Sequence, residues 1–213
     1  MSEVPGSQGA PRRSAVEAVR RAQIVDAAIT VVAEEGYARA SMARIAAQAG
    51  LSKGLLSYHF RSKDDLLEQA MRSTFAAITA AVIAEIDVGA PAPEILRAAI
   101  HRVADYGSAH RHQLRAMDQI VRNLRDAQGR PILTLADYDE VYGQIEQLFR
   151  KGQREGTFRS FDTRVMAVTY QAALDAMFGY ADAFPGTELG PYATALADLL
   201  VAAVVAPPPS SES

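Results

Sequence analysis

Apolar residues recur at spacings of three, four and seven along most of this chain, which is the period of an amphipathic helix. No segment shows a convincing alternation of apolar and polar residues of the kind that marks a half-buried strand. Proline, which breaks helix interiors, is absent from residues 12–90, 94–130 and 132–184, and these intervals are rich in good helix formers. The pattern predicts an all-α protein.

Capping residues define the ends of the N-terminal helices. Gly36 and Gly50 are suited to stop helices, and Ser41 and Ser52 are suited to begin them as N-caps. Residues 62–65 resemble a capping box and place acidic groups at the positive end of a long helix. The predicted helices span residues 16–35, 41–49, 52–59, 63–87, 94–109, 112–125, 132–155, 163–183 and 191–206.

Composition narrows the class of protein. The 213 residues are 49% hydrophobic, enough for the core of one domain or of two small ones. The chain has no Cys, which excludes disulfides, thiolate metal sites and a cysteine nucleophile. No apolar run approaches the roughly 18 residues of a membrane span, and the N-terminus lacks the apolar core of a signal peptide. We therefore expect a soluble, cytoplasmic protein with no membrane partner.

The charge is unevenly distributed. The net charge is -3, but residues 10–63 carry nine Lys or Arg residues against four Asp or Glu residues. A basic N-terminal third on an acidic body is expected where one end of a protein meets a polyanion. On charge alone, chance clustering of solvated side chains remains an open alternative.

Residues 41–59 combine a short helix, a tight turn and a second short helix, which is the plan of a helix-turn-helix. In this plan the first helix braces the second, and the second lies in the major groove of DNA. The side chains predicted to hold the helices together are apolar: Ile45, Ala46, Ala49, Leu51, Leu56 and Phe60. The outward face of the second helix then presents Lys53, Gly54, Leu55, Ser57, Tyr58 and His59.

These outward residues have the chemistry that DNA contact needs. Lys53, Tyr58 and His59 can donate to phosphate oxygens. Ser57 can hydrogen-bond a base edge, and Leu55 can pack on a thymine methyl group. Taken singly, Tyr58 and His59 are equally well explained as an aromatic pair at a helix end, and Lys53 as a solvated charge. Their occurrence together favours DNA contact.

A family resemblance rests on short motifs within residues 27–67. The motifs are Glu35-Gly36-Tyr37, Ile45-Ala46 with Ala49-Gly50, Ser52-Lys53-Gly54, Tyr58-His59-Phe60, and Ser62-Lys63 with Leu66. Together they strongly resemble the DNA-binding domain of the TetR family of bacterial transcriptional regulators. Two positions depart from the family pattern, which commonly has Thr in place of Ser41 and an aromatic residue in place of Ser57. The operator sequence is therefore harder to infer.

The resemblance implies a homodimeric repressor that binds a palindromic double-stranded DNA operator and is released by a small-molecule effector. The predicted domains are a disordered arm (1–15), a helix-turn-helix domain (16–62), a helical regulatory and dimerisation domain (63–206) and a disordered tail (207–213). The predicted DNA contacts are Ser41, Arg44, Lys53, Gly54, Leu55, Ser57, Tyr58, His59 and Lys63. For Arg44, simple solvation of the first helix is an equal alternative. Arg12, Arg13, Arg20 and Arg21 form either a DNA-contacting arm or, as we expect, a disordered basic tail.

The C-terminal part carries large side chains on Ala-rich helices. The resemblance implies that some of them line an effector cavity: Phe75, Tyr106, Met117, Tyr138, Tyr142, Tyr170, Met177 and Phe178. For any single residue, packing in an ordinary core is an equally good interpretation. Arg115, Asp118 and Arg122 share one helical stripe, which forms a surface salt-bridge set or, if it points inward, favours an anionic ligand.

Small and branched residues on the last two predicted helices suggest contact with a second subunit. They are Val165, Val168, Ala172, Ala176 and Gly179, followed by Leu196, Leu199, Leu200 and Ala203. Part of this set must instead pack against the core of the protein's own subunit.

No catalytic or cofactor motif stands out. His110 and His112 diverge by about 200° on a helix and lack a third ligand, which argues against a metal site. The glycines are scattered at helix ends and form no phosphate loop. We therefore predict no enzyme, no metal and no cofactor. One alternative is a helical ligand-binding protein or enzyme with a vestigial DNA-binding bundle, and another is an activator or a nucleoid-type architectural DNA binder.

Overall fold

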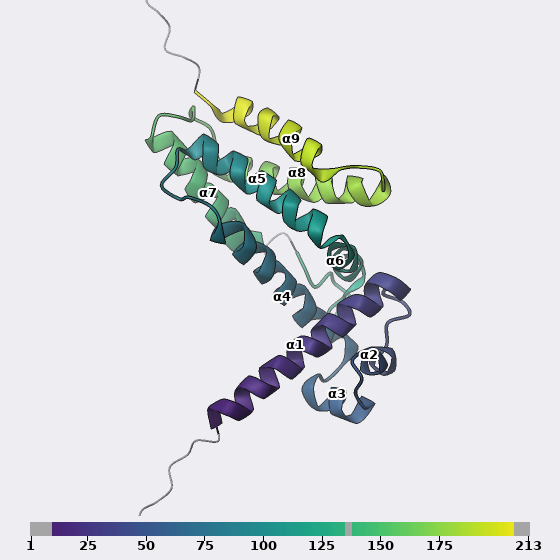
Figure 1. The fold of residues 1–213 in the computed structure, drawn as a ribbon. Coiled ribbons are helices and arrows are strands. Elements are labelled where there is room, and N and C mark those ends of the chain that lie inside the picture. Colours follow the sequence, from purple (N-terminus) through teal and green to yellow (C-terminus); the bar gives the residue numbers. More distant parts are fainter. Residues whose placement is uncertain (1–9, 135–137, 207–213) are drawn as a thin grey trace, which may run out of the picture. The chain divides into compact units, whose positions relative to one another are not determined.

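The computed structural model describes residues 10–134 and 138–206, apart from the side chains of residues 10–14. Within these ranges it has nine helices and no strand, which confirms the all-α prediction (Figure 1). They are α1 (Ala10–Glu35), α2 (Met42–Gln48), α3 (Lys53–His59), α4 (Lys63–Ala84), α5 (Ala92–Ala109), α6 (Arg111–Asn123), α7 (Asp139–Arg154), α8 (Thr163–Ala183) and α9 (Leu189–Val204).

The first helix begins earlier than predicted. Residues 10–15, assigned above to a disordered arm, are part of α1. Pro11 was treated as a barrier to the helix, but a proline in the first turn lacks only an N–H that would have no helical partner there. Helix α1 includes Arg12, Arg13, Arg20 and Arg21, so the prediction that they form a disordered basic tail is wrong. Residues 1–9 and the predicted tail 207–213 lie outside the described residues.

The helix predicted at 132–155 starts at Asp139 instead. A tight turn follows α6, because the Asp126 carboxylate accepts from the backbone N–H groups of Gln128 and Arg130, both at 2.9 Å. The chain then doubles back, and the N–H of Ile132 donates to the carbonyl of Leu124 at 3.2 Å. These bonds hold residues 126–132 in a hairpin-like loop that propensity alone does not reveal.

The chain divides into two compact units. The N-terminal unit comprises residues 1–74 and 115–132, and the C-terminal unit comprises residues 75–114 and 133–213. This division differs from the predicted boundary after residue 62, because the first half of α4 and residues 115–123 of α6 belong to the N-terminal unit. Leu66, Leu67 and Met71 of α4 and Ile120 of α6 are almost completely buried.

The core of the N-terminal unit is built around α1. Its inner face carries Ile24, Ala28, Val31 and Val32, each no more than 2% exposed. Ile45, Leu56 and Phe60 are buried as predicted, whereas Ala49 and Leu51 are only half-buried. The two short helices are thus fixed by a few large side chains.

The C-terminal unit packs α5, α7, α8 and α9 around one core, with α5 against α9 and α7 against α8. Figure 1 shows these four helices as a layered bundle. Gly107 on α5 permits close approach to α8, since a Cβ at that position would collide with the ring of Phe178. The result is a tight helical unit held mainly by aromatic and aliphatic side chains.

Candidate functional site

The turn between α2 and α3 is defined by local hydrogen bonds. The hydroxyl of Ser41 accepts from the N–H of Arg44 at 3.3 Å, and the hydroxyl of Ser52 accepts from the N–H of Leu55 at 3.2 Å. Both predicted N-caps are therefore confirmed. Gly50 has a φ of 66°, in the left-handed region that glycine adopts without strain. The turn fixes the direction in which α3 leaves α2.

Helix α3 presents nearly all of its side chains to solvent. Leu56 is its one completely buried residue, while Lys53, Gly54 and Ser57 are exposed. Leu55 is 40% exposed and Tyr58 is 77% exposed. A large aromatic side chain as exposed as that of Tyr58 contributes little to the stability of the folded chain. The face predicted from the sequence is therefore available to a partner.

Neither a close contact within the chain nor the backbone conformation requires a glycine at position 54. A Cβ at this position would meet only the hydroxyl of Ser52, at 4.0 Å. The φ of Gly54 is not in the left-handed region, so another residue would fit the backbone. The helix would gain about 1 kcal/mol from Ala in its place. The fold of the chain therefore does not require a glycine at this position.

His59 closes α3 and is half-buried. Its ring lies edge-on to that of Tyr58, with centroids 5.2 Å apart. The Nδ1 atom is buried and has no hydrogen-bond partner among the described residues. The backbone carbonyl of His59 accepts from the Nη1 atom of Arg21 at 2.6 Å. The backbone of His59 therefore holds the end of α3, while the Nδ1 atom of the His59 ring has no partner among the described residues.

Arg21 is a residue that sequence reasoning misplaced. Besides the bond to His59, its guanidinium donates to the side chain of Gln69 on α4 and lies 4.4 Å from the ring centroid of Phe60. One side chain of α1 therefore ties the end of α3 to α4. Arg20, its neighbour, only contacts Gln23 one turn away on α1, at 3.2 Å. No local motif distinguishes the two arginines.

Lys63 lies at the start of α4 and is less free than the sequence suggested. Its Nζ donates to the carbonyl of Tyr37 at 2.7 Å and lies 4.0 Å from the centroid of that ring. Burial lowers the pKa of Lys63 and raises that of Tyr37. The N–H of Tyr37 in turn donates to Oε1 of Gln119 on α6 at 2.9 Å. Lys63 and Gln119 together anchor the loop that leads into α2.

Arg44, on the exposed face of α2, forms an ion pair with Glu35 at the end of α1. The Arg44 guanidinium lowers the pKa of the Glu35 carboxyl through a hydrogen bond and its positive charge. Surface pairs of this kind contribute little to stability, so Arg44 remains able to exchange its partner. Ser41, by contrast, already uses its hydroxyl as a cap.

The predicted effector residues are distributed among several environments in the C-terminal unit. Tyr170 and Met177 are buried in its core, and burial raises the pKa of the Tyr170 phenol. Tyr106 is half-buried, stacks on His110 with centroids 4.0 Å apart, and bonds Gln113. Phe178 packs against the core beside Gly107. These four residues do not form one cluster by ring contact.

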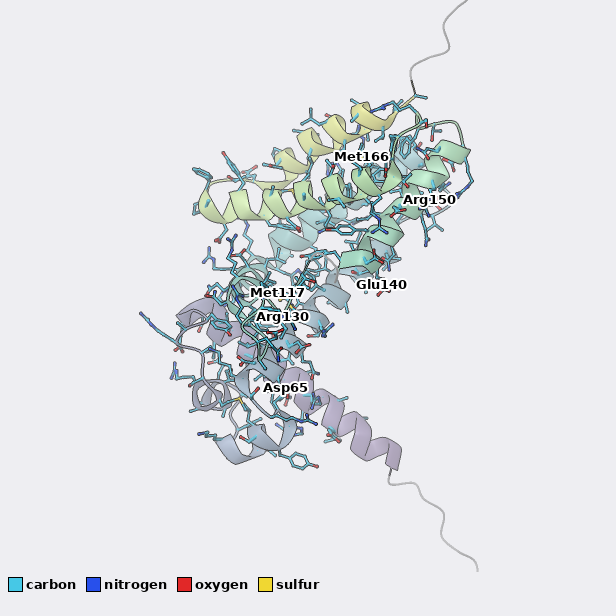
Figure 2. The ribbon with its side chains drawn as sticks, turned by 180° about the vertical axis from the view of Figure 1, so that it is seen from behind. Asp65, Met117, Arg130, Glu140, Arg150 and Met166 are labelled. Atoms are coloured by element: carbon cyan, nitrogen blue, oxygen red, sulfur yellow. The ribbon has the colours of Figure 1, made fainter. Side chains whose placement is uncertain are left out.

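Three of the predicted effector residues do come together. The rings of Phe75 and Tyr138 are 6.3 Å apart edge to face, and those of Tyr138 and Tyr142 are stacked at 5.8 Å. Phe75 and Tyr138 are half-buried and Tyr142 is buried. Met117 belongs instead to the N-terminal unit, where it is buried on α6 (Figure 2).

The stripe on α6 is a surface feature. Asp118 and Arg122 form an ion pair at 2.7 Å with both side chains largely exposed. This supports the surface salt-bridge interpretation for that pair over an inward-facing anion site.

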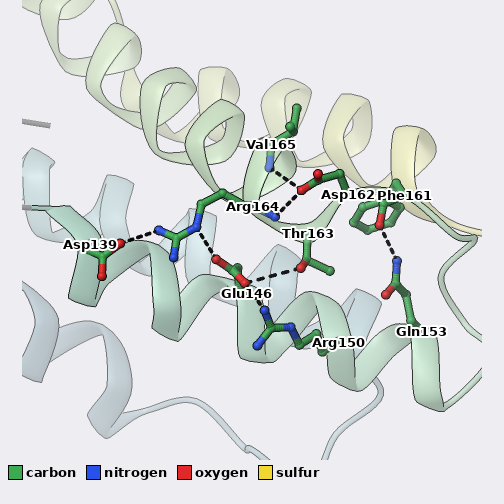
Figure 3. Close-up of polar contacts among 9 residues, drawn as sticks. All are labelled: Asp139, Glu146, Arg150, Gln153, Phe161, Asp162, Thr163, Arg164 and Val165. Carbon is green, nitrogen blue, oxygen red and sulfur yellow. Dashed lines mark hydrogen bonds and ion pairs between the residues drawn. The ribbon is translucent and has the colours of Figure 1, made fainter. Parts of the chain in front are cut away.

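Glu146 of α7 is the one charged residue counted as buried in the described part of the chain, at 3% exposure. It accepts from Arg150 one turn later and from Thr163, and its Oε1 lies 2.5 Å from Nε of Arg164 (Figure 3). Arg164 also bonds Asp139 at 2.9 Å. The network joins α7 to the start of α8. Sequence analysis missed it, because its partners come together only in the fold.

The described residues also bear on metal binding and on membrane insertion. Among them, no group of three or more His, Asp or Glu side chains is placed to hold a metal ion. None of the helices described is both long and apolar enough to cross a membrane.

Known proteins resemble this chain most clearly over the helix-turn-helix. A family model described as "Bacterial regulatory proteins, tetR family" matches residues 24–70. The HTH-type transcriptional regulator BetI of Escherichia coli is 38% identical over 68 residues, which are 32% of this chain and 35% of BetI. The chain thus matches about a third of the length of these curated relatives.

Solved structures extend the similarity to the fold of most of the chain. A transcriptional regulator from Saccharomonospora viridis, solved in complex with choline, aligns with a TM-score of 0.76 and 24% identity, covering 89% of this chain and 100% of that one. The TetR family regulator PfmR from Thermus thermophilus aligns with a TM-score of 0.69 and 25% identity, covering 84% and 97%. With the helix-turn-helix geometry, these matches show that residues 24–70 are similar to the DNA-binding domain of the TetR family of bacterial regulatory proteins, and that most of the chain has the fold of solved TetR family regulators.

Proposed function

We propose that this protein is a transcriptional repressor that binds a palindromic DNA operator through α3. The observation that carries the proposal is the outward face of α3, where Lys53, Leu55, Ser57 and Tyr58 are exposed and take no part in the core. A helix of seven residues is long enough to reach only a few base pairs, so its contacts must be concentrated on one face. The proposed site of action is bacterial DNA in the cytoplasm.

The exposed side chains divide into two proposed roles. Lys53, Tyr58 and His59 neutralise or donate to phosphates, and this fixes the position of α3 in the groove. Leu55 and Ser57 meet base edges and set the preferred sequence. Gly54 lets the backbone of α3 approach the DNA closely. Ser41, Arg44 and Lys63 act less directly, since each already has a partner within the chain.

The protein is proposed to act as a homodimer, because two recognition helices are needed to read two half-sites. A stripe along α8 supports this: Val165 is 63% exposed, and Val168, Ala172, Ala176 and Gly179 are exposed with it. Leu199 of α9 is 70% exposed. Such a stripe of small and branched residues allows close packing of helices across an interface.

A small-molecule effector is proposed to bind the C-terminal unit and release the operator. The support is the group of aromatic side chains in that unit and the choline complex of the Saccharomonospora viridis regulator, whose fold is similar. The effector can weaken DNA binding only by its differential affinity for two conformations, and the coupling must be reciprocal. No catalytic step is part of this proposal.

The test of DNA binding begins with selection of duplexes from a random-sequence library on the full-length protein. The selected sequences are expected to contain two inverted half-sites. Tyr58→Ala and Lys53→Ala should each weaken binding of the selected duplex, measured by fluorescence anisotropy, and Leu55→Ala should change which duplex is preferred. Arg154→Ala, which removes a positive charge from exposed α7 surface, is the matched control and should bind like the wild type. Selection that yields no sequence preference would contradict the proposal.

The dimer is tested separately by light scattering. Replacing both Val168 and Leu199 with Glu places charges in the proposed interface and should give a monomer with weaker operator binding. Val88→Glu alters an exposed valine outside α8 and α9 and should leave the dimer intact. A wild-type monomer at micromolar concentration, with and without operator, would refute the proposed assembly.

A further inference from the structure

The first turns of α1 are exposed on all sides in the described part of the chain. Residues 15–19 are exposed one after another, and five successive residues cover more than a whole helical turn. Val16 is 66% exposed and Val19 is 59% exposed, whereas the buried face of α1 begins only at Ile24. We call residues 10–20 the free segment of α1, and Figure 1 shows it extending away from α2 and α3.

The free segment takes no part in the core of its unit. Helices in proteins owe most of their stability to the packing of one apolar face, and an isolated helix this short is marginal in water. Here the segment continues a helix whose later turns are packed, so its first turn does not have to be nucleated separately. The chain thus presents a helical extension whose surface is left for contact with another molecule.

The free segment begins at the end of α3. Arg21, the next residue, donates from Nη1 to the carbonyl of His59 at 2.6 Å, and its guanidinium carbon lies 4.4 Å from the ring centroid of Phe60. Tyr58 and His59, two of the proposed phosphate contacts, are therefore next to the point where the free segment leaves the unit. Arg61 follows Phe60 directly and belongs to the same place.

The arginines at this place are not neutralised by described carboxylates. The guanidinium of Arg20 bonds the side chain of Gln23 at 3.2 Å, and none of the ion pairs between described residues includes it. Arg61 is exposed and also belongs to none of these pairs, although its backbone N–H donates to Asp65 at 2.9 Å. Both positive charges are available to an anion outside the chain.

The free segment is basic along its length. Its first turn carries Arg12 and Arg13, and its acidic residue is Glu17, so three arginines against one glutamate give a net charge of +2. Arg13 and Arg20 are seven residues apart, which places them on one side of the helix, about 10 Å apart along its axis. Phosphates of one DNA strand follow each other every 3.4 Å or so along the duplex, so the segment can span about three of them.

The position of the free segment favours DNA over other anionic partners. A basic helix that leaves the unit beside Tyr58 and His59 meets the phosphates that continue from those two contacts. Phosphate contacts of this kind fix position and add affinity, but they read no bases. A second subunit is the other possible partner, and the mass in solution distinguishes it.

We propose that the free segment of α1 and Arg61 form a second DNA-contacting surface, in which Arg12, Arg13, Arg20 and Arg61 bind the phosphates flanking the half-site read by α3. The proposal rests on the proposed function for the operator and deepens it, because it adds contacts outside the groove that α3 enters. These contacts are independent of sequence, so they lengthen the site without changing the preferred half-site.

The first test measures affinity against salt by fluorescence anisotropy, with the full-length protein and the selected duplex. The double variant Arg12→Ala/Arg13→Ala should reduce the log-log slope by about two units per subunit, and Arg61→Ala by about one, with the same preferred sequence. Arg154→Ala is the control for loss of a positive charge and should keep the wild-type slope. A wild-type slope for a folded double variant would overturn the proposal, and for Arg61→Ala it would overturn the assignment of that residue.

The sign of the effect is checked at Glu17. This carboxylate lies within one turn of both Arg13 and Arg20 on the same side of the helix, so it opposes their attraction to phosphate. Glu17→Gln should bind DNA more tightly than the wild type, by severalfold at low salt. Weaker binding by this variant would contradict the proposed contact.

The second test varies the length of the duplex. Two duplexes carry the same selected sequence, one with about 3 and the other with about 9 further base pairs on each side. The wild type should bind the longer duplex severalfold more tightly, and Arg12→Ala/Arg13→Ala should lose most of this gain. Circular dichroism melting establishes that the variant is folded. An equal gain for both proteins would show that the free segment does not reach the flanking phosphates.

A duplex of random sequence separates the two proposals, because phosphate contacts need no particular sequence. A protein that selects an operator, but whose salt slope is unchanged in the double variant, would refute the second surface alone. A protein that selects no sequence, but whose slope on random DNA falls in the double variant, would refute the repressor proposal and leave this surface standing. A double variant that loses its dimer mass in light scattering at an unchanged slope would make the free segment a subunit contact and refute the proposal.

Discussion

Helices α2 and α3 are equal in length and begin in the same way, yet their outer faces differ. Both have seven residues and a serine N-cap, and both bury only one or two side chains. The exposed face of α2 carries small residues and Arg44, which is paired with Glu35. The exposed face of α3 carries Lys53, Leu55 and Tyr58, without such a pair. The charged residue on the outer face of α2 has a partner within the chain, whereas the large outer side chains of α3 have no ion pair, and this difference supports α3 as the proposed binding face.

The largest expected difference in unfolding free energy is between replacements on the inner side and on the outer side of α3. Leu56→Ala removes a completely buried side chain and should lower the free energy of unfolding by about 2–5 kcal/mol. Leu55→Ala, one residue away and 40% exposed, should lower it by less than about 1 kcal/mol. Urea denaturation measures both. Equal losses would show that α3 is not oriented as described.

The second test concerns the support of α3 from α1. Arg21→Ala removes the donor to the His59 carbonyl and the contact with Phe60, and should cost about 1–3 kcal/mol of unfolding free energy. It should also weaken operator binding, since the end of α3 loses its anchor. Arg20→Ala removes the same charge from the neighbouring position and should cost less than about 0.5 kcal/mol. If the two variants behave alike, Arg21 acts through charge alone.

The caps of the two helices should be nearly equivalent. Ser41→Ala and Ser52→Ala each remove one side-chain acceptor from a helix start and should each cost about 1 kcal/mol, measured by thermal or urea unfolding. Ser41→Asp and Ser52→Asp keep an acceptor and should restore most of the loss. A much larger effect at one serine would indicate a role beyond capping at that position.

Replacing the exposed basic residues of α2 and α3 should barely change stability, but the two replacements should differ in their effect on DNA binding. Arg44→Ala and Lys53→Ala each alter an exposed basic residue and should change unfolding free energy by less than about 0.5 kcal/mol. Lys53→Ala should reduce the salt dependence of operator binding by about one unit of log-log slope per subunit. Arg44→Ala should reduce it less, because Glu35 already balances that charge. Identical slopes for the two variants would remove the distinction between α2 and α3.

The predictable parts of this molecule are those fixed by nearby residues. The serine caps, the glycine turn and the exposed face of α3 each depend on spacings of a few residues, and they are found as predicted except that His59 is half-buried. Arg21 was misplaced because its partner His59 is 38 residues away. Met117 was grouped with the wrong unit, because hydrophobic period shows that a side chain is buried but not against which helices. Helix caps and turns can be predicted from nearby residues, whereas contacts between residues far apart in the sequence cannot.

The C-terminal part of α6 belongs to the N-terminal unit, and this has a consequence for protein engineering. Because Gln119 bonds Tyr37, and Ile120 is completely buried, a fragment ending at residue 74 would lack part of the unit that carries α3. A chimeric regulator made by exchanging only the first 74 residues would place a foreign α6 against this core. Operator-swapped chimeras should therefore carry residues 115–132 together with the N-terminal segment, or redesign Tyr37 and its surroundings to match the recipient helix.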